Sequence, residues 1–582
     1  MSERTLDWNL LKRLLPYLRN YRFLAISSVA LMVLIGIFSV LHPYLIKYGI
    51  DQNISQGDLP GLWKTAYLLF GVMLGSFLFS VLFEYTVQFL GQRMLLDLRL
   101  DLFKHVLTLS RQYFDRTAVG KTLTNITNDV EAIRAFVSEG VVTVVGELLK
   151  VGFILLAMML VNYKLTLLTF LTIPLFFFAT MLFRKSIRSG FRGVRRANAD
   201  INTALVESIT GIREIIQFTH KDKSKDSFET SNRHYLEAYL KVVHAYALYF
   251  PILEIVSNVS LLIILLYAHF SIGVSVQVGE IFAFFAYINM FFRPLRELAE
   301  KFNMFQSAMA ASERVFRLLD TTSAITSPTK PIPVPHPFKG GIEFRDVTFA
   351  YNPGTPVLKK VSFFIQPGER VALVGFTGSG KTTIINLINR FYDIQEGSIL
   401  VDGVDIRQYD LPALRRQIAV VPQDPFLFTG TVGQNISLHD PALTAEQIQE
   451  AARKVNARQF IDALPGKFDE EVLEEGKKLS VGQKQLLSFA RAVVRNPSIL
   501  ILDEATSSID SRTEKHIEAA TRELIAQRTS IIIAHRLSTI RAVDRVLVLH
   551  KGRLAEEGTH EELMELEGMY SRLYKTQAMS LM

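Results

Sequence analysis

The feature that most constrains the fold is a set of long apolar runs in the first half of the chain. Residues 65–83, 165–183 and 255–279 contain no Asp, Glu, Lys or Arg. A bilayer core about 30 Å thick is crossed by roughly 20 apolar residues in a helix, and a soluble helix of that length rarely lacks charge. We therefore expect membrane-spanning helices. Six are predicted, at about 23–46, 64–90, 141–163, 165–183, 246–270 and 277–296.

The composition agrees with a membrane part and argues against several other classes of protein. The chain has 582 residues, of which 49% are hydrophobic. Its mean hydropathy is +0.23, which is above the usual range of soluble proteins. The net charge of +8 indicates basic cytoplasmic loops, and because no basic and aromatic cluster accompanies it, nucleic-acid binding is not expected. The chain has no cysteine, which excludes disulfides and thiolate metal sites.

The distribution of Lys and Arg predicts how the helices are oriented. Basic residues precede the first run and are frequent in 91–139 and 184–245, whereas 271–279 has none. By the positive-inside tendency, both ends of the bundle and both long segments are cytoplasmic. The two segments keep a helical apolar period, so we expect long cytoplasmic helical extensions with turns near 114–120 and near Gly211.

Two further features of this half are the N-terminal segment and a few charges at membrane depth. Leucines between residues 10 and 18 form one apolar stripe, which suits a helix on the membrane surface or one packed against the bundle.

Glu147 and Lys150 are three residues apart and are expected to pair. Glu84 and Glu254 have no obvious local partner, so we predict that they line a substrate path.

A change of composition marks the domain boundary. Five prolines lie between residues 328 and 337, and such a segment favours an extended spacer. Beyond it, short β-rich runs alternate with helical patterns, which is typical of an α/β domain. We predict a membrane domain at 1–320, a linker at 321–340 and a nucleotide-binding domain at 341–582.

The second domain contains a phosphate-binding motif. A strand pattern from Arg370 is followed by a glycine-rich loop that ends in Gly-Lys-Thr, which matches GxxxxGK[ST] in its required context. Backbone N–H groups of such a loop point at phosphate oxygens, the lysine reaches the β- and γ-phosphates, and the threonine hydroxyl binds Mg²⁺. The predicted ATP-binding residues of this loop are Gly375, Thr377, Gly378, Ser379, Gly380, Lys381, Thr382 and Thr383.

Two carboxylates follow a second buried strand. Four apolar residues at 499–502 run directly into Asp503 and Glu504. Such a strand carries acids to the carboxyl edge of a parallel sheet, where ligands bind. Asp503 is suited to the Mg²⁺ sphere, and Glu504 to activating the attacking water as general base.

Taken together with further motifs, this half resembles the ATP-binding cassette (ABC) superfamily, and the whole chain resembles bacterial exporters that join one membrane domain to one cassette. Leu479 to Gln483 is similar to the LSGGQ signature, and Val421 to Asp424 is similar to the Q-loop. Ser507 to Asp510 resembles the D-loop, Ala534 to Arg536 the switch histidine, and Phe349 to Tyr351 the adenine-stacking aromatic.

The resemblance implies roles for these residues. It implies a six-helix, all-α transmembrane domain fused to an α/β P-loop domain, in an integral protein of the bacterial inner membrane. Two cassettes would close head to tail over two ATP molecules, with turns of the membrane domain seated in the cassettes. The residues implied are Tyr351 on adenine, Gln423 at Mg²⁺ and the water, His535 at the γ-phosphate, Asp510 in the D-loop, and Ser480, Gly482 and Gln483 on the opposing ATP.

Val481 departs from the family pattern because it replaces a glycine of the signature. We expect its bulk and its restricted φ to weaken the ATP site that this signature completes, which belongs to the partner chain. A heterodimer with a second half-transporter is therefore favoured, and a homodimer remains an alternative.

The sequence thus predicts ATP-driven export of an amphipathic, drug-like or lipidic molecule by alternating access, in contact with membrane lipids. The alternative is an ATP-gated or regulatory membrane protein without efficient transport. Glu504 favours the first hypothesis, because a protein that does not hydrolyse ATP needs no general base.

Overall fold

The computed structural model describes residues 8–271, 276–473, 476–503, 511–526, 528–534 and 540–579. The chain forms two compact units. The first combines residues 1–107 with 120–321, and the second combines residues 108–119 with 322–582. The short segment 108–119 therefore belongs to the C-terminal unit although it lies in the N-terminal half of the sequence.

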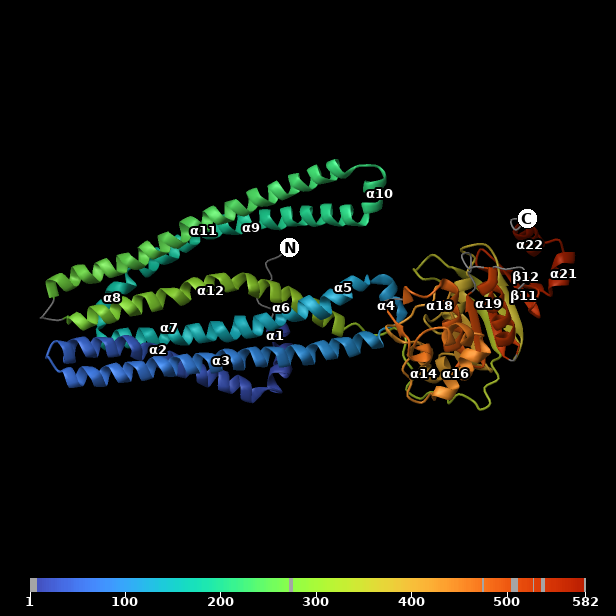
Figure 1. Cartoon of the computed structure of the whole chain (residues 1–582), viewed down its shortest axis with the longest axis horizontal. Helices are drawn as coiled ribbons and strands as arrows, with labels where there is room; N and C mark the ends of the chain where they lie inside the picture. Colours follow the sequence, from blue (N-terminus) through green and yellow to red (C-terminus); the bar gives the residue numbers. More distant parts are fainter. Residues whose placement is uncertain are drawn as a thin grey trace. The chain divides into compact units, whose positions relative to one another are not determined.

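Within the described residues, the regular elements of the first unit are all helices, joined by short turns. Long helices run side by side, and α9 and α11 form a hairpin that is closed by α10 (Figure 1). Its elements are α1 (Trp8–Arg19), α2 (Arg22–Tyr48), α3 (Leu59–Thr108), α5 (Val119–Thr124), α6 (Val130–Ala135), α7 (Thr143–Val161), α8 (Tyr163–Phe170), α9 (Ile173–Thr210), α10 (Ile212–Gln217), α11 (Lys221–Ser271) and α12 (Val278–Leu319), with short π-helical stretches at Gly49–Ile54, Asn125–Asp129 and Phe136–Val142.

Five of these helical stretches are long and apolar enough to cross a membrane, within the residues that the structure describes. They are Arg22–Ile54, Leu59–Thr108, Val119–Val161, Tyr163–Thr210 and Lys221–Phe270. The sixth predicted span, 277–296, does form a helix, within α12, but is not among the five. Within 277–296, Glu280, Arg293 and Arg296 interrupt the apolar run. The prediction of six spans is thus supported for five.

The long helices continue past the length that a bilayer requires. α3 has 50 residues, or about 75 Å at 1.5 Å per residue, against a hydrocarbon core of roughly 30 Å. The predicted turns are present, since α4 (Arg111–Arg116) ends before α5, and α9 ends at Gly211 before α10. α10 exposes Ile212 and Ile216, and Phe218 directly after the helix is exposed as well.

The N-terminal helix packs against the bundle, which decides between the two possibilities that its apolar stripe left open. Arg13 donates two hydrogen bonds of 2.7 Å to Asp320 at the end of α12, and its guanidinium lies 4.3 Å from the centre of the Phe316 ring. Tyr17 donates to Asp101 of α3 at 3.2 Å. Leu14 is buried by this packing.

Three of the charges predicted at membrane depth, Glu84, Glu147 and Lys150, have partners. Lys150 and Glu147 are 4.0 Å apart, which confirms the predicted pair. Glu84 accepts a hydrogen bond from Gln88 at 3.0 Å, so the expectation that it has no local partner is wrong.

A buried polar cluster explains how α12 carries an acid near its start. Glu280 is 3.4 Å from the Lys47 ammonium of α2 and accepts from Asn162, between α7 and α8, at 2.9 Å. The N–H of Gly279 donates to Asp51 at 2.7 Å. Buried charges in membrane proteins are stabilised by such pairing, and this cluster joins α12 to α2 and α7.

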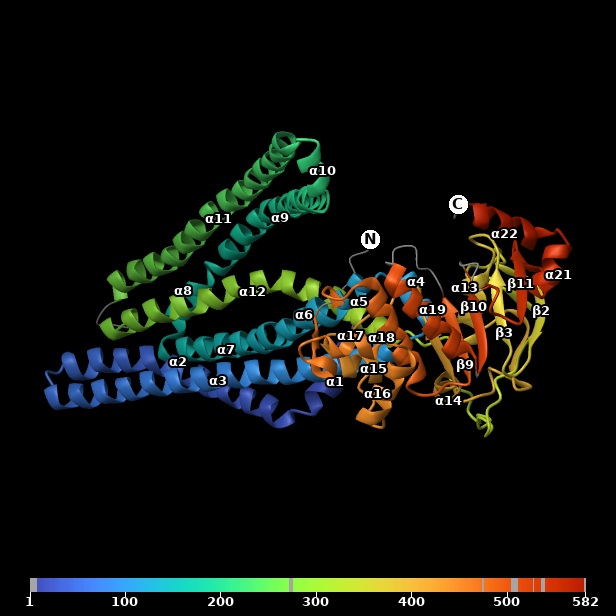
Figure 2. The ribbon, with the colours of Figure 1, turned by 45° about the vertical axis from the view of Figure 1, so that its right-hand side comes forward.

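The second unit is an α/β domain with two principal sheets. A six-stranded sheet has the order β12-β11-β3-β10-β9-β6 and is parallel except for the edge strand β12, and an antiparallel sheet has the order β2-β1-β4-β5. Figure 2 shows β9, β10, β3 and β11 adjacent in the first sheet. The strands are β1 (Ile342–Phe349), β2 (Leu358–Ile365), β3 (Arg370–Val374), β4 (Glu396–Val401), β5 (Val404–Asp405), β6 (Ile418–Val421), β7 (Gly430–Thr431), β8 (Glu471–Val472), β9 (Ile499–Asp503), β10 (Thr529–Ile533), β11 (Arg545–His550) and β12 (Arg553–Gly558).

Helices cover these sheets and bury two cores of aliphatic side chains around the central strands. The helices are α13 (Lys381–Ile388), α14 (Leu411–Arg416), α15 (Val432–Ser437), α16 (Ala445–Lys454), α17 (Arg458–Asp462), α18 (Val481–Val493), α19 (Ser511–Ile525), α21 (His560–Glu565) and α22 (Met569–Met579), with a 3-10 turn at Lys467–Asp469.

The proline-rich segment is irregular, as predicted, but it is also fastened to the domain. The N–H of Ile332 donates to the carbonyl of Gln408 at 2.8 Å. Ser327 donates to Asp410 at 3.0 Å and accepts from the N–H of Leu411 at the same distance. The segment is therefore bound to the domain surface along part of its length.

Candidate nucleotide-binding site

The parallel sheet gathers the predicted site residues at one edge. β10 pairs with β3 and β9 in parallel, with Ile533 opposite both Leu373 and Asp503. β6 pairs with β9 so that Val421 lies opposite Leu502. Because the carboxyl ends of parallel strands meet at one edge, the glycine loop after β3, Asp503 at the end of β9, and Gln423 after β6 lie at the same edge.

Three glycines give the loop between β3 and α13 its shape. Gly375, Gly378 and Gly380 have φ angles of +154°, +79° and +110°, which side-chain-bearing residues rarely adopt. Gly375 also has no room for a side chain, since a Cβ there would lie 2.3 Å from the carbonyl oxygen of Leu549. The loop therefore depends on glycine at these positions.

Lys381 is the first residue of α13 and is buried. Its ammonium donates to the carbonyl oxygens of Gly375 at 2.7 Å and Phe376 at 3.2 Å. Burial lowers the pKa of this ammonium, and the nearby Asp503 carboxylate opposes that shift. The Lys381 ammonium is thus hydrogen-bonded to the backbone of its own loop, near the Asp503 carboxylate at the end of β9.

The hydroxyl residues of the loop differ in their surroundings. Thr377 and Thr382 are exposed, whereas Ser379 and Thr383 are buried. The Ser379 hydroxyl is a buried polar atom with no hydrogen-bond partner in the described part of the chain. Buried polar groups normally have a partner, so this hydroxyl fits a site that receives an anionic ligand.

Tyr351 follows β1, and its hydroxyl is tied to α13. The hydroxyl donates to Thr383 at 3.2 Å and accepts from Asn386 at 3.2 Å. The backbone of the preceding residue is fixed as well, because the side-chain amide of Gln395 accepts from the N–H of Ala350 and donates to its carbonyl oxygen.

The sequence analysis did not identify Asn386 or Gln395. For Asn386 the available signal was its spacing of three residues from Thr383, which places both on one helix face.

The segment 108–119 contacts this part of the domain. The Arg111 guanidinium lies 5.5 Å from the centre of the Phe391 ring, and Arg116 donates to the carbonyl oxygen of Tyr351 at 3.5 Å. A segment from between two membrane-length helices therefore touches the residue predicted to bind adenine.

The signature residues cap a helix. Ser480 is the N-cap of α18, and its hydroxyl accepts from the N–H of Gln483 at 3.2 Å while the Gln483 side chain accepts from the N–H of Ser480 at 2.9 Å. This reciprocal capping box leaves the Ser480 hydroxyl proton free to donate. Gly482 is buried in the first turn.

The backbone conformation of Val481 differs from the one expected from the sequence. It is the first residue of α18 and is not among the described residues with positive φ, so the expectation of a φ conflict is wrong. A β-branched residue tolerates helical φ. Its side chain is 54% exposed at the start of the helix. The bulk of Val481, and not its φ, is therefore the property that still supports a weakened ATP site in the partner chain.

Three predicted site residues, Glu504, Asp510 and His535, lie outside the described residues. Their roles, like those of the other site residues, stay predictions.

The arrangement fits ATP with Mg²⁺. A glycine loop that opens a helix can present N–H groups and positive potential to phosphates, and Thr382 and Asp503 carry oxygen atoms of the kind that Mg²⁺ takes as ligands. The buried, unpaired Ser379 hydroxyl is one more donor for such a ligand.

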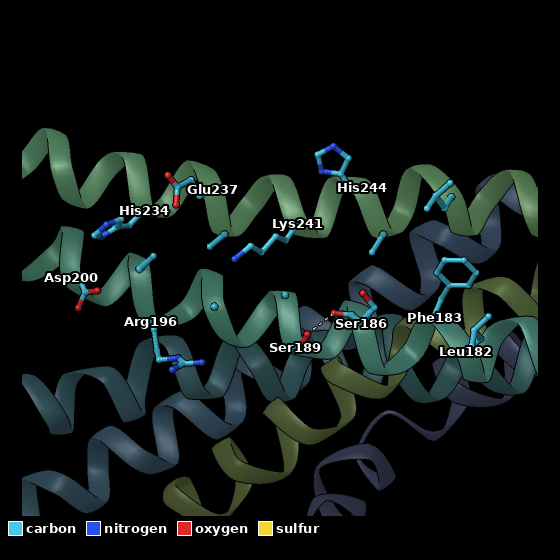
Figure 3. Close-up of a pocket in the computed structure, with 16 residues that line it drawn as sticks. Leu182, Phe183, Ser186, Ser189, Arg196, Asp200, His234, Glu237, Lys241 and His244 are labelled. Atoms are coloured by element: carbon cyan, nitrogen blue, oxygen red, sulfur yellow. Dashed lines mark hydrogen bonds between the residues drawn. The ribbon is translucent and has the colours of Figure 1, made fainter.

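Apart from the predicted nucleotide site, a cavity lies between α9 and α11 of the first unit (Figure 3). Its volume is about 1010 Å³. The two helices approach closely at one point of its wall, where a Cβ on Gly190 would lie 2.7 Å from Val242. The charged and histidine side chains lining it are Arg196, Asp200, His234, Glu237, Lys241 and His244.

A phosphate loop on a parallel sheet, joined in one chain to membrane-length helices, defines a membrane protein with its own ATPase domain. Comparison with known proteins identifies the family. The model of the ABC transporter transmembrane region matches residues 25–295, and the model of the ABC transporter domain matches residues 358–507.

Relatives match along almost the whole chain. An ABC transporter ATP-binding protein of Bacillus subtilis, YknV, is 36% identical over 579 residues, which cover 99% of this chain and 96% of the relative. A probable multidrug resistance ABC transporter ATP-binding/permease protein of the same organism, YheH, is 38% identical over 90% of this chain and 79% of its own length. The structure of a bacterial Atm1-family ABC exporter with ATP bound aligns with a TM-score of 0.79 at 28% identity, over 96% of this chain and 98% of that one.

The chain belongs to the ABC transporter family, and it is an ATPase coupled to membrane transport.

Proposed function

We propose that this chain is one half of an exporter that moves an amphipathic, drug-like or lipidic molecule out across the bacterial inner membrane by alternating access. The observation that carries the proposal is the phosphate loop with Lys381 against its backbone, in a chain with membrane-length helices. Support comes from relatives named for multidrug export and from the similar fold of an exporter. The sixth span, 277–296, and Glu84 and Glu254 on the substrate path are parts of the same proposal.

The site residues divide the work of hydrolysis. Mg²⁺ would neutralise charge on the β- and γ-phosphates, held by Thr382 and Asp503 with Gln423 nearby. Lys381 and the loop N–H groups bind the phosphates, and Glu504 accepts the proton of the attacking water. His535 orients Glu504 and the γ-phosphate, and Tyr351 stacks on adenine.

The first test removes the loop lysine. We expect Lys381→Ala to abolish ATP-driven dye uptake into inside-out vesicles and to weaken ATP binding by at least about 100-fold, because a buried cation beside the phosphates is lost. The matched control is Lys454→Ala at the exposed end of α16, which should resemble the wild type.

Two results would contradict the proposal. Unchanged ATP affinity in Lys381→Ala would refute the phosphate-loop role. ATP binding without ATP-dependent dye movement, over a panel of amphipathic dyes and fluorescent lipids, would favour the ATP-gated or regulatory alternative.

The working unit is proposed to be a dimer, with a heterodimer favoured. Ser480 and Gln483 bond each other in α18, and we propose that they face the ATP of a second cassette. Val481 adds bulk at that surface, so a partner with a normal signature would leave this chain's own site fully active and the partner's site slower.

Co-expression tests this arrangement. We expect the chain purified alone to have much lower transport-coupled ATPase activity than the chain purified with the half-transporter encoded beside it. Equal activity of the chain alone would show that it works as a homodimer and that Val481 is tolerated.

A further inference from the structure

Asn386 of α13 donates to the hydroxyl of the predicted adenine-binding residue Tyr351, which in turn donates to the predicted phosphate-binding residue Thr383. We propose that Asn386 is a positioning residue for ATP binding, which acts through Tyr351 to orient the Thr383 hydroxyl. The inference rests on the proposed function, because it assumes that ATP binds at this loop.

Three side chains form one hydrogen-bonded chain. The amide nitrogen of Asn386 lies 3.2 Å from the hydroxyl oxygen of Tyr351, which in turn lies 3.2 Å from the hydroxyl oxygen of Thr383. Thr383 and Asn386 are three residues apart on α13 and face the same side. The Thr383 side chain is buried, and those of Tyr351 and Asn386 are half-buried, so water competes weakly for these bonds.

The donor and acceptor properties of the three side chains give their hydrogen bonds one direction. The NH₂ group of an asparagine can only donate, so the Tyr351 oxygen is an acceptor toward Asn386. The single proton of the phenol is then directed to the Thr383 oxygen. A hydroxyl that already accepts a bond directs its own proton elsewhere, and near the start of α13 the acceptor that suits it is an anionic phosphate oxygen.

The aromatic ring of Tyr351 is restrained at the same time. It meets Phe349 at 84° with ring centres 4.9 Å apart, and Tyr392 at 89° with centres 5.0 Å apart. A ring held by two edge contacts and by its hydroxyl has little freedom left to lose when a base stacks on it. Such preorganisation raises affinity by lowering the cost of ordering.

Through its one bond to Tyr351, Asn386 therefore affects both the predicted adenine contact and the predicted phosphate contact. Its loss would free the phenol and remove the directional preference of the Thr383 hydroxyl, although neither nucleotide-contacting side chain is changed. A merely structural role, in which Asn386 only stabilises α13, predicts a loss of thermal stability without a specific effect on ATP binding.

The test is a set of substitutions in the full-length chain, assayed as ATPase in lipid nanodiscs together with its partner if it needs one. Asn386→Ala removes the bond from Asn386 to Tyr351, and Tyr351→Phe removes that bond together with the bond to Thr383. Each variant is expected to raise the KM for ATP about three- to tenfold, the effect expected for loss of a net hydrogen bond, with kcat nearly unchanged. The double variant should be no worse than either single one, because the two changes break one chain.

Asn386→Asp separates proton direction from packing. The carboxylate has the same shape but can only accept, so the phenol proton would turn toward it and the Thr383 hydroxyl would lose its donor. We expect this variant to raise the KM at least as much as Asn386→Ala. Asn389→Ala at the C-cap of the same helix is the control, since the Asn389 side chain donates to the helix carbonyl of Ile385. This variant should lower the melting temperature without changing the KM.

Three results would overturn the inference. These are a wild-type KM in Asn386→Asp, additive effects in the double variant, or equal effects of Asn386→Ala and Asn389→Ala on the KM. If Asn386→Ala fails to fold, Tyr351→Phe and Asn386→Asp still decide the matter. Failure of the proposed function is seen separately, as ATPase activity that does not depend on Lys381.

Discussion

Replacing Glu504 with Gln is expected to leave ATP binding intact and to lower ATP turnover by about 10²–10⁴-fold. In the sequence, Glu504 directly follows Asp503, the last residue of the buried strand β9. An amide has nearly the same shape as a carboxylate but cannot accept the proton of the attacking water. The loss should therefore appear in kcat rather than in nucleotide affinity.

The measurement is the ATPase rate of the purified transporter at saturating ATP, with binding of a fluorescent ATP analogue measured in parallel. Glu565→Gln in α21 makes the same chemical change at an exposed position and should hydrolyse ATP at the wild-type rate. Turnover near that of the wild type in Glu504→Gln would show that another group accepts the proton.

Much of the architecture could be predicted because two kinds of continuous apolar run are present in the sequence. Uncharged runs such as 165–183 need a membrane, and apolar runs such as 499–502 suit the buried strands of a parallel sheet. The glycine spacing between Gly375 and Gly380 similarly predicted a phosphate-binding loop. These features are local, so a single segment is enough to read them.

The sequence was less informative where a property depends on residues distant in the chain. Glu280 interrupts the sixth apolar run, but its partners are Lys47 of α2 and Asn162 between α7 and α8. No local pattern in the sequence shows that the charge is paired. The place of segment 108–119 in the ATPase unit is a tertiary property of the same kind.

Within the candidate site, motif positions were predictable and their hydrogen bonds were not. The bonds of Tyr351 to Thr383 and Asn386 bring a loop after β1 to a helix after β3, which requires the folded sheet. Val481 shows the opposite error, since a conformational conflict was inferred from residue type although the residue begins a regular helix.

The glycines of the phosphate loop offer a prediction in which two similar substitutions should differ strongly. Gly375→Ala places a methyl group 2.3 Å from the carbonyl oxygen of Leu549 in β11 and 2.7 Å from the Ser379 hydroxyl, at a φ of +154°. A backbone carbonyl within a sheet cannot move aside as a side chain can. We expect this change to cost more than about 3 kcal/mol and to reduce ATP affinity by more than 100-fold, because the loop must leave its phosphate-binding shape.

Gly378→Ala is the matched control, because only the backbone angle is at issue there. Its φ is +79°, and a methyl group would meet no atom within 4 Å, so the expected cost is about 1–2 kcal/mol. Thermal melting of the nucleotide-free protein compares the two without any contribution from a bound ligand. Gly375→Ala should lower the melting temperature clearly more than Gly378→Ala does. Equal shifts would mean that φ alone, and not contact with β11, requires glycine at position 375.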